Sequence, residues 1–315
     1  MPPHAVEVAD LRRTFVAGRG RSKRTIEAVD GISFTVEPGE RLAYIGPNGA
    51  GKSTSIKMLT GILHPSGGSA SVLGLVPWHQ RRDLTRRIGT LFGQRSQLWL
   101  ELTPRQSFRM LGAIYGLSDD AIARRVGELG ELLDAADLFD SAVRGLSLGQ
   151  RMRCELAACL LHEPEILFLD EPTIGLDLLG KTALRELLVR LNDERRTTIF
   201  LTSHDVADIE HVARRVIVIN HGHVIYDDEV AAVRRTLLAT KLVEVTLDAP
   251  AAPVALAGVT VTASTATTWE LVVDTTVLPV RRLLDVLLET FPVVDLSVSD
   301  PPLEQVIAEI YAAPR

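Results

Sequence analysis

The sequence predicts an α/β fold with a mainly parallel sheet over most of its length. Between about residues 32 and 226, short β-branched or aliphatic runs alternate with helical patterns. Apolar residues make up 46% of the chain and charged residues 23%, which is the balance of a globular protein that can build a core. A length of 315 residues leaves room for roughly two domains.

The expected strands of the sheet are short and recur along the chain. They are 41–45, 88–92, 166–169, 198–202 and 216–219. A Gly-containing turn and the apolar run 224–226 follow the last of them, so we expect a hairpin and an antiparallel strand at one edge of the sheet. A basic run between two early strands is predicted to be a solvated hairpin loop or, alternatively, a contact with anionic lipid headgroups; it comprises Arg19, Arg21, Lys23 and Arg24.

A helical insertion interrupts the α/β pattern between about residues 95 and 162. Helical periodicity covers 104–115, 119–133 and 149–161. Ser118 before two aspartates is a typical helix start, because a hydroxyl and early carboxylates complement the N-terminal amides.

From residue 239 an Ala/Pro-rich and then Thr-rich composition predicts a small α+β appendage, residues 239–315, after a first domain of residues 1–238. Its expected elements are strands 242–247, 271–274 and 294–298 and helices 280–290 and 303–311.

Charge, hydropathy and cysteine usage exclude several classes of protein. A formal charge of −6 gives no global cationic field, so we expect no stable nucleic-acid partner. No apolar run approaches the roughly 20 residues of a spanning helix, and the first residues lack a secretory pattern. We therefore expect a cytosolic chain that does not cross a membrane by itself. Cys154 and Cys159 have no ligand spacing and are expected to be buried apolar residues.

Strand 41–45 runs into a glycine-rich loop that a helical pattern follows. The loop has the phosphate-binding pattern of a glycine, four residues and Gly-Lys-Ser. Its glycines let backbone amides and the helix N-terminus point at phosphates. Lys52 is expected between the β- and γ-phosphates, and Ser53 on Mg²⁺. The predicted nucleotide contacts of this P-loop NTPase core are Gly46, Asn48, Gly49, Ala50, Gly51, Lys52, Ser53 and Thr54. Alone, the loop indicates only a nucleoside triphosphate.

Two adjacent carboxylates, Asp170 and Glu171, end the apolar strand 166–169. A buried strand of this kind delivers charge to the carboxyl edge of a parallel sheet, where such sheets bind ligands. Because side chains alternate along a strand, the two acids cannot face the metal together. We assign Asp170 to Mg²⁺ through its water, and Glu171 to orienting and deprotonating the attacking water, a role that typically contributes 10²- to 10⁴-fold.

The segment Leu-Ser-Leu-Gly-Gln at 146–150 resembles the signature Leu-Ser-Gly-Gly-Gln of the ATP-binding cassette (ABC) family. Leu148 stands where that family commonly has glycine. A hydroxyl and amides at the start of a helix form a second anion site. The resemblance implies that Ser147 and Gly149 bind the γ-phosphate of ATP held by a second copy of the subunit, and that Gln150 also belongs to the nucleotide-binding residues. Function would then require a dimer, most simply a homodimer.

Four further residues match the family's elements and take their expected roles from the resemblance. Gln94 resembles the glutamine that senses Mg²⁺ and the nucleophilic water, and Asp177 lies in a loop similar to the one that crosses the dimer interface. His204 resembles the switch histidine that donates to the γ-phosphate. Phe15 matches the aromatic residue on which adenine stacks, with a plain core position as the alternative.

The resemblance is closest to cassette subunits of two-component exporters of the ABC-2 type. It implies an ATPase on the cytoplasmic face of the cell membrane that drives export of a drug, antibiotic, lipid or polysaccharide through a separate permease. Trp99, Leu100 and Leu102 are expected to form an exposed strip that receives the permease, unless Trp99 is core. The alternatives are an importer cassette and a soluble ABC ATPase that acts on DNA or the ribosome.

Overall fold

The computed structural model describes residues 4–17, 24–92, 96–233 and 240–299. The chain divides into two compact units, Met1–Asp227 and Asp228–Arg315. The boundary predicted at residues 238–239, most of the basic run near residue 20 and the helix predicted at 303–311 lie outside the described residues. None of the helices in the described ranges is both long and apolar enough to span a bilayer.

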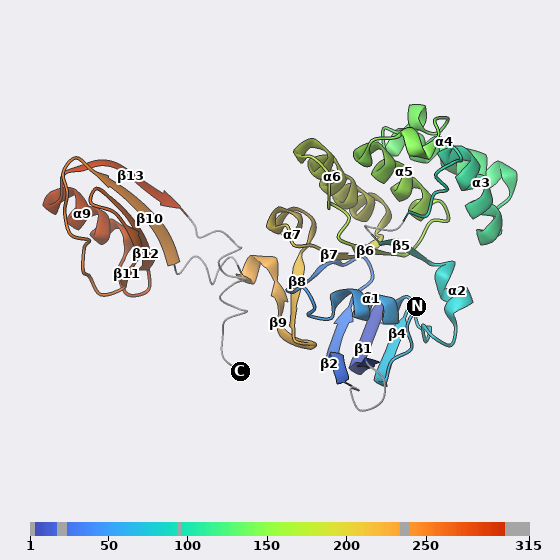
Figure 1. Ribbon diagram of the computed structural model, residues 1–315, viewed down its shortest axis with the longest axis horizontal. Coiled ribbons are helices and arrows are strands. Elements are labelled where there is room, and N and C mark those ends of the chain that lie inside the picture. Colours follow the sequence, from blue (N-terminus) through green and yellow to red (C-terminus); the bar gives the residue numbers. More distant parts are fainter. Residues whose placement is uncertain (1–3, 18–23, 93–95, 234–239, 300–315) are drawn as a thin grey trace. The chain divides into compact units, whose positions relative to one another are not determined.

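A six-stranded sheet forms the centre of the first unit (Figure 1). Its order is β5 (Ile88–Phe92), β6 (Ile166–Asp170), β7 (Thr198–Thr202), β3 (Arg41–Ile45), β8 (Arg215–Asn220) and β9 (His223–Glu229). The pairs from β5 to β8 are parallel, as predicted. A two-residue turn joins β8 to β9, and only antiparallel strands can be joined so tightly. The parallel strands are continuous apolar runs because both faces of the sheet are covered.

A second, antiparallel sheet packs with the first. It consists of β2 (Arg24–Val36), β1 (Val6–Ala17) and β4 (Gly67–Val72), and α1 (Lys52–Leu59) contacts both β2 and β4. The ring of Tyr44 lies 5.7 Å from that of Phe34 on β2 and 5.3 Å from that of Phe200 on β7. These aromatic contacts join the two sheets in one core.

The helices α3 (Pro104–Tyr115), α4 (Asp119–Leu132) and α5 (Leu148–Leu160) lie within the range predicted for the insertion, residues 95–162. The helices α2 (Arg81–Thr85), α6 (Leu178–Arg195) and α7 (Val206–Val212) lie outside that range. Figure 1 shows α3, α4 and α5 grouped together, and each contacts the other two. The Ser118 hydroxyl accepts a hydrogen bond from the Ala121 amide, so this residue caps α4 as predicted. Cys154 and Cys159 are buried on α5, and burial raises the pKa of each thiol to about 12.

The second unit is an antiparallel sheet with one helix. The sheet order is β11 (Val259–Ser264), β12 (Thr268–Asp274), β10 (Thr240–Leu247) and β13 (Val293–Ser299), and the helix is α9 (Val280–Thr290). Leu283 and Leu287 of α9 are fully buried in a core that contains Trp269. The Trp269 and Phe291 rings meet edge to face at 4.8 Å. This unit has its own hydrophobic core, and it combines strands and a helix as expected from the sequence.

Candidate nucleotide-binding and hydrolysis site

The glycine-rich loop lies tightly between β3 and α1, against two other strands. Gly51 caps α1 with a φ of 110°, and a Cβ atom there would lie 2.4 Å from the carbonyl oxygen of Ala28 on β2. A Cβ atom on Gly46 would lie 2.2 Å from the carbonyl oxygen of Ile219 on β8. Glycine is therefore required at both positions, because the loop backbone packs directly against these two strands.

The Lys52 side chain lies under this loop and is only 6% exposed. Its Nζ donates to the carbonyl oxygens of Gly46 and Pro47, at 2.5 and 3.2 Å. Burial lowers the pKa of Lys52, while the nearby carboxylates of Glu171 and Asp170 oppose that shift. A buried ammonium at the N-terminus of a helix is suited to bind an anion such as a triphosphate.

The acidic pair follows β6, next to the end of β7. The Thr202 hydroxyl donates to Asp170 Oδ1 at 2.8 Å, and the Glu171 amide donates to the Thr202 carbonyl at 3.1 Å. Glu171 has a φ of 55°, in the left-handed region that costs a non-glycine residue roughly 1–2 kcal/mol. Thr202 is not among the predicted site residues, although it lies at the carboxyl end of the strand next to β6, where ligand-binding side chains are expected.

Glu171, His204 and Lys52 form a continuous line of contacts. Glu171 Oε1 lies 2.6 Å from His204 Nε2, and His204 Nε2 lies 3.5 Å from Lys52 Nζ. The line brings together a carboxylate that can accept a proton, an imidazole and an ammonium. Gln94, the remaining predicted catalytic residue, lies outside the described residues.

Ser53 and Asp170 offer the hydroxyl and carboxylate oxygens that Mg²⁺ prefers. Both are half-buried, at the start of α1 and the end of β6. Over the described part of the chain, no group of three or more His, Cys, Asp or Glu side chains could hold a metal ion. Mg²⁺ is usually bound through one or two protein oxygens together with water and substrate phosphates.

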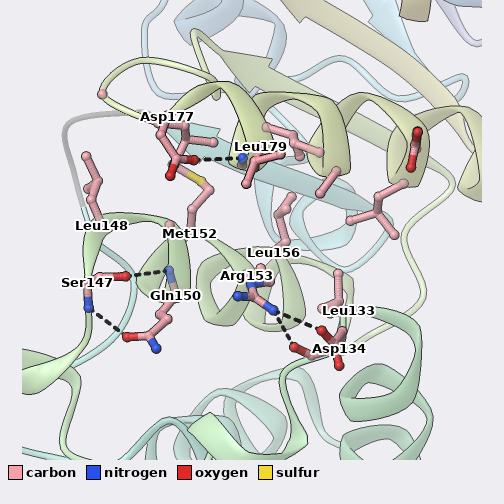
Figure 2. A pocket seen from close by; sticks show the side chains of 18 of the residues that line it. Leu133, Asp134, Ser147, Leu148, Gln150, Met152, Arg153, Leu156, Asp177 and Leu179 are labelled. Atoms are coloured by element: carbon pink, nitrogen blue, oxygen red, sulfur yellow. Dashed lines mark hydrogen bonds and ion pairs between the residues drawn. The ribbon is translucent and has the colours of Figure 1, made fainter.

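Residues 147–150 of the signature-like segment lie along a groove of about 730 Å³ between α5 and α6 (Figure 2). The Ser147 hydroxyl accepts from the Gln150 amide at 3.3 Å, and the Gln150 side chain accepts from the Ser147 amide at 2.9 Å. This reciprocal pair caps α5. On the opposite wall, Asp177 caps α6 by accepting from the Gly180 amide at 2.8 Å. The structure thus brings Ser147, Gln150 and Asp177 to one groove, with Gly149 in its lining.

Leu148, the departure from the family signature, reaches across this groove. It is 48% exposed, and its Cδ2 lies 2.6 Å from the place that a Cβ atom on Gly175 would occupy. Gly175 has a φ of 75° and precedes Asp177 by two residues. The leucine therefore packs on the loop that leads into α6.

Phe15 lies on β1, opposite Ile26 of β2, and is half-buried. The Arg13 guanidinium carbon lies 4.6 Å from the centre of its ring, and Arg13 donates to the His64 carbonyl at 2.8 Å. One face of the aromatic ring is thus covered by a cation that the backbone holds in place. Stacking of adenine on the other face stays a prediction.

Two residues of the expected docking strip are exposed large apolar side chains. Trp99 is 39% exposed and Leu100 is 48% exposed, whereas Leu102 is half-buried. The alternative that Trp99 is a core residue is therefore wrong.

Comparisons with known proteins agree with the fold and the motifs. A family model described as ABC transporter matches residues 29–174. The ABC transporter ATP-binding protein NatA of Bacillus subtilis (strain 168) is 35% identical over 204 residues, 65% of this chain and 82% of that protein. The daunorubicin/doxorubicin resistance ATP-binding protein DrrA of Streptomyces peucetius is 33% identical over 236 residues, 75% of this chain and 68% of that protein.

Among solved structures, cbiO1 from Clostridium perfringens, part of the ABC transporter complex cbiONQ, is 28% identical. It has a TM-score of 0.63 and covers 75% of this chain and 95% of that one. With its phosphate loop, acidic pair and signature-like segment on this fold, the chain belongs to the ABC transporter family of ATP-binding proteins.

Proposed function

We propose that this chain is the ATP-hydrolysing subunit of a two-component ABC exporter, acting as a homodimer at the cytoplasmic face of the membrane. The observation that carries the hydrolysis step is the 2.6 Å contact between Glu171 and His204, with Lys52 at 3.5 Å from the same imidazole nitrogen. These three groups supply the base, a donor to the γ-phosphate and the phosphate-binding charge that hydrolysis of a triphosphate needs.

Each residue has a defined part in the proposed step. Lys52 and the loop amides bind the β- and γ-phosphates. Ser53 would hold Mg²⁺ directly and Asp170 would hold it through a water molecule, and the ion would offset the charge on the transferring phosphoryl group. Glu171 orients a water molecule and accepts its proton. His204 donates a hydrogen bond to a γ-phosphate oxygen, which keeps that phosphate in line with the water.

The homodimer is inferred from the position of the signature-like groove. Ser147 and Gly149 line a groove with Asp177, whereas Lys52 contacts Gly46, Pro47 and His204, so the two halves of the proposed ATP site use different surfaces of the unit. A second copy can place its Ser147 against the phosphate that Lys52 holds. Leu178 and Leu179, just after Asp177, are 75% and 79% exposed, as expected of residues that a protein partner covers.

Export through a separate permease is supported by the relatives and by an apolar strip. DrrA is named as a daunorubicin/doxorubicin resistance protein, and its similarity covers 75% of this chain. Trp99 and Leu100 offer the kind of aromatic and aliphatic anchors that occupy interface centres. The cargo belongs to the drug, antibiotic, lipid or polysaccharide classes, and the permease selects it.

Purification of the intact complex from membranes tests this function. We expect the tagged full-length chain to bring down a polypeptide with several spanning helices, and the Trp99→Ala variant to lose it. Trp78 is partly buried against the core of the first unit, and the control variant Trp78→Ala should retain the polypeptide. The specific ATPase activity of the purified chain should rise with its concentration. A specific activity that stays constant on dilution to the nanomolar range contradicts the shared site, and co-purification of ribosomes or DNA instead of a permease contradicts transport.

A further inference from the structure

A buried carboxylate on α7, outside the line of catalytic contacts, gathers three hydrogen-bond donors. Asp208 is fully buried, and its Oδ2 accepts from the hydroxyls of Thr173 and Ser203, at 2.6 and 2.5 Å. Its Oδ1 accepts from Arg185 Nε on α6 at 2.6 Å. A carboxylate only accepts hydrogen bonds, so all three contacts match its chemistry. The Arg185 cation offsets the cost of burying the charge.

The two hydroxyls belong to the segments that carry the proposed catalytic pair. Thr173 follows Glu171 by two residues, and Ser203 directly precedes His204. We propose that Asp208 is a positioning residue, which holds these two segments in register so that the Glu171 carboxylate and the His204 imidazole meet. This inference rests on the proposed hydrolytic function.

Packing alone does not impose the contact between the catalytic pair. The side chain of His204 is 41% exposed and that of Glu171 is 23% exposed, so solvent reaches both. Glu171 also has the strained φ of 55°, which persists only where the surrounding structure determines it. Two fixed points lie close to it: its own amide is bonded to Thr202, and Thr173 is bonded to Asp208.

The network extends from Asp208 to the starts of α6 and α7. Arg185 reaches Asp205 at 3.1 Å, and Lys181 donates to the same Asp205 oxygen at 2.7 Å. Asp205, the residue after His204, caps α7 by accepting from the Ala207 amide at 3.0 Å. The segment of His204 is thus held on both sides, through Ser203 and through Asp205.

Variants at Thr173 test the inference, because they change one bond and leave Asp208 itself in place. Thr173→Val keeps the shape of the side chain and removes the hydroxyl, whereas Thr173→Ser keeps the hydroxyl. A displacement of about 1 Å in a catalytic group can cost about 10²-fold in rate. We expect Thr173→Val to lower kcat by about 10- to 100-fold with KM for ATP within about threefold, and Thr173→Ser to stay within about threefold in both.

Thr198→Val is the matched control. Thr198 is also a buried threonine, 2% exposed. It lies at the first residue of β7, whereas the proposed site is at the other end of this strand, and its hydroxyl accepts from the Gly39 amide. This variant should lower the melting temperature as Thr173→Val does, yet keep kcat. Equal kcat losses in Thr173→Val and Thr198→Val, or none in Thr173→Val, would overturn the positioning role.

A second readout needs no turnover, which separates this inference from the proposed function. In NMR spectra of the nucleotide-free full chain, the ring Cε1–H signal of His204, assigned by its loss in His204→Gln, should shift in Thr173→Val and stay in place in Thr173→Ser and Thr198→Val. An unmoved signal in Thr173→Val contradicts the inference. A wild-type protein that hydrolyses no ATP contradicts only the proposed function, and the NMR result then decides the role of Asp208.

Discussion

Replacing Lys52 with methionine removes one buried charge and nearly preserves side-chain volume. A unit charge about 4 Å from a phosphate oxygen contributes roughly 4 kcal/mol at an effective dielectric constant of about 20. To reach the phosphates the ammonium gives up its bonds to the Gly46 and Pro47 carbonyls, worth about 1 kcal/mol each. The net contribution is about 2 kcal/mol, so Lys52→Met should weaken ATP binding by about 30-fold.

The same substitution should change how stability depends on pH. Burial lowers the pKa of Lys52 below its ordinary 10.5, so the folded protein releases this proton before the unfolded chain does. Between the lowered pKa and 10.5 the unfolded state binds more protons, and the wild-type free energy of unfolding therefore rises with pH relative to that of Lys52→Met. Below the lowered pKa the full cost of the buried charge is present.

Calorimetric titration with MgATP at fixed ionic strength measures the loss of ATP affinity. Denaturant unfolding between pH 7 and pH 10.5 measures how the free energy of unfolding depends on pH. Lys57→Met is the control, because Lys57 lies on the same helix with the same charge and is half-buried, without a contact to the loop carbonyls. ATP affinity within threefold of wild type in Lys52→Met, or an equal loss in Lys57→Met, would refute the role of the buried ammonium.

Three further variants probe the site and the second unit. Glu171→Gln should bind ATP, hydrolyse it at least about 100-fold more slowly and accumulate as a dimer in gel filtration; near-normal hydrolysis would contradict a role as base. Gly175→Ala should lower the free energy of unfolding by about 1–2 kcal/mol because of its φ of 75°, and by more if the new methyl group also meets Leu148. In the double variant Gly175→Ala/Leu148→Gly, only the loss that comes from this contact should be recovered. If the losses in the two single variants simply add in the double variant, the contact is excluded. Trp269→Ala should destabilise the second unit by about 3–5 kcal/mol in calorimetry and leave ATP binding intact. Trp269→Phe should destabilise it less, because the buried indole N–H has no partner in the described part of the chain. An equal destabilisation in both variants would contradict this reasoning.

The parallel sheet and the insertion could be predicted from sequence because their signals are local. Strands 41–45, 88–92 and 198–202 occur where predicted, since a strand buried on both faces is a continuous apolar run bounded by polar loops. Helix 104–115 also has the predicted ends. Thr103 and Gln106 form a capping box at its start, and Gly116 ends it with a φ of 78°.

Contacts between distant segments could not be predicted in this way. Asp208 is the acidic residue in the first turn of α7. Its partners Thr173 and Arg185 are 35 and 23 residues away, and periodicity within a helix carries no information about them. The contact between Leu148 and Gly175 could not be predicted from sequence either, because it depends on how the starts of α5 and α6 are placed on either side of one groove.

At the acidic pair the chain departs from strand alternation, and each of the two carboxylates has a different partner. Asp170 still belongs to β6, and its carboxylate is bonded to Thr202 on the next strand. At Glu171 the chain leaves the strand with a left-handed φ, and the carboxylate contacts His204. Alternation alone would separate the two acids but would not select a partner for the second one. Because the change of direction occurs at a non-glycine residue, it needs anchors on both sides, and the bonds to Thr202 and from Thr173 to Asp208 provide them. The proposed base therefore depends on a carboxylate that takes no part in the chemistry.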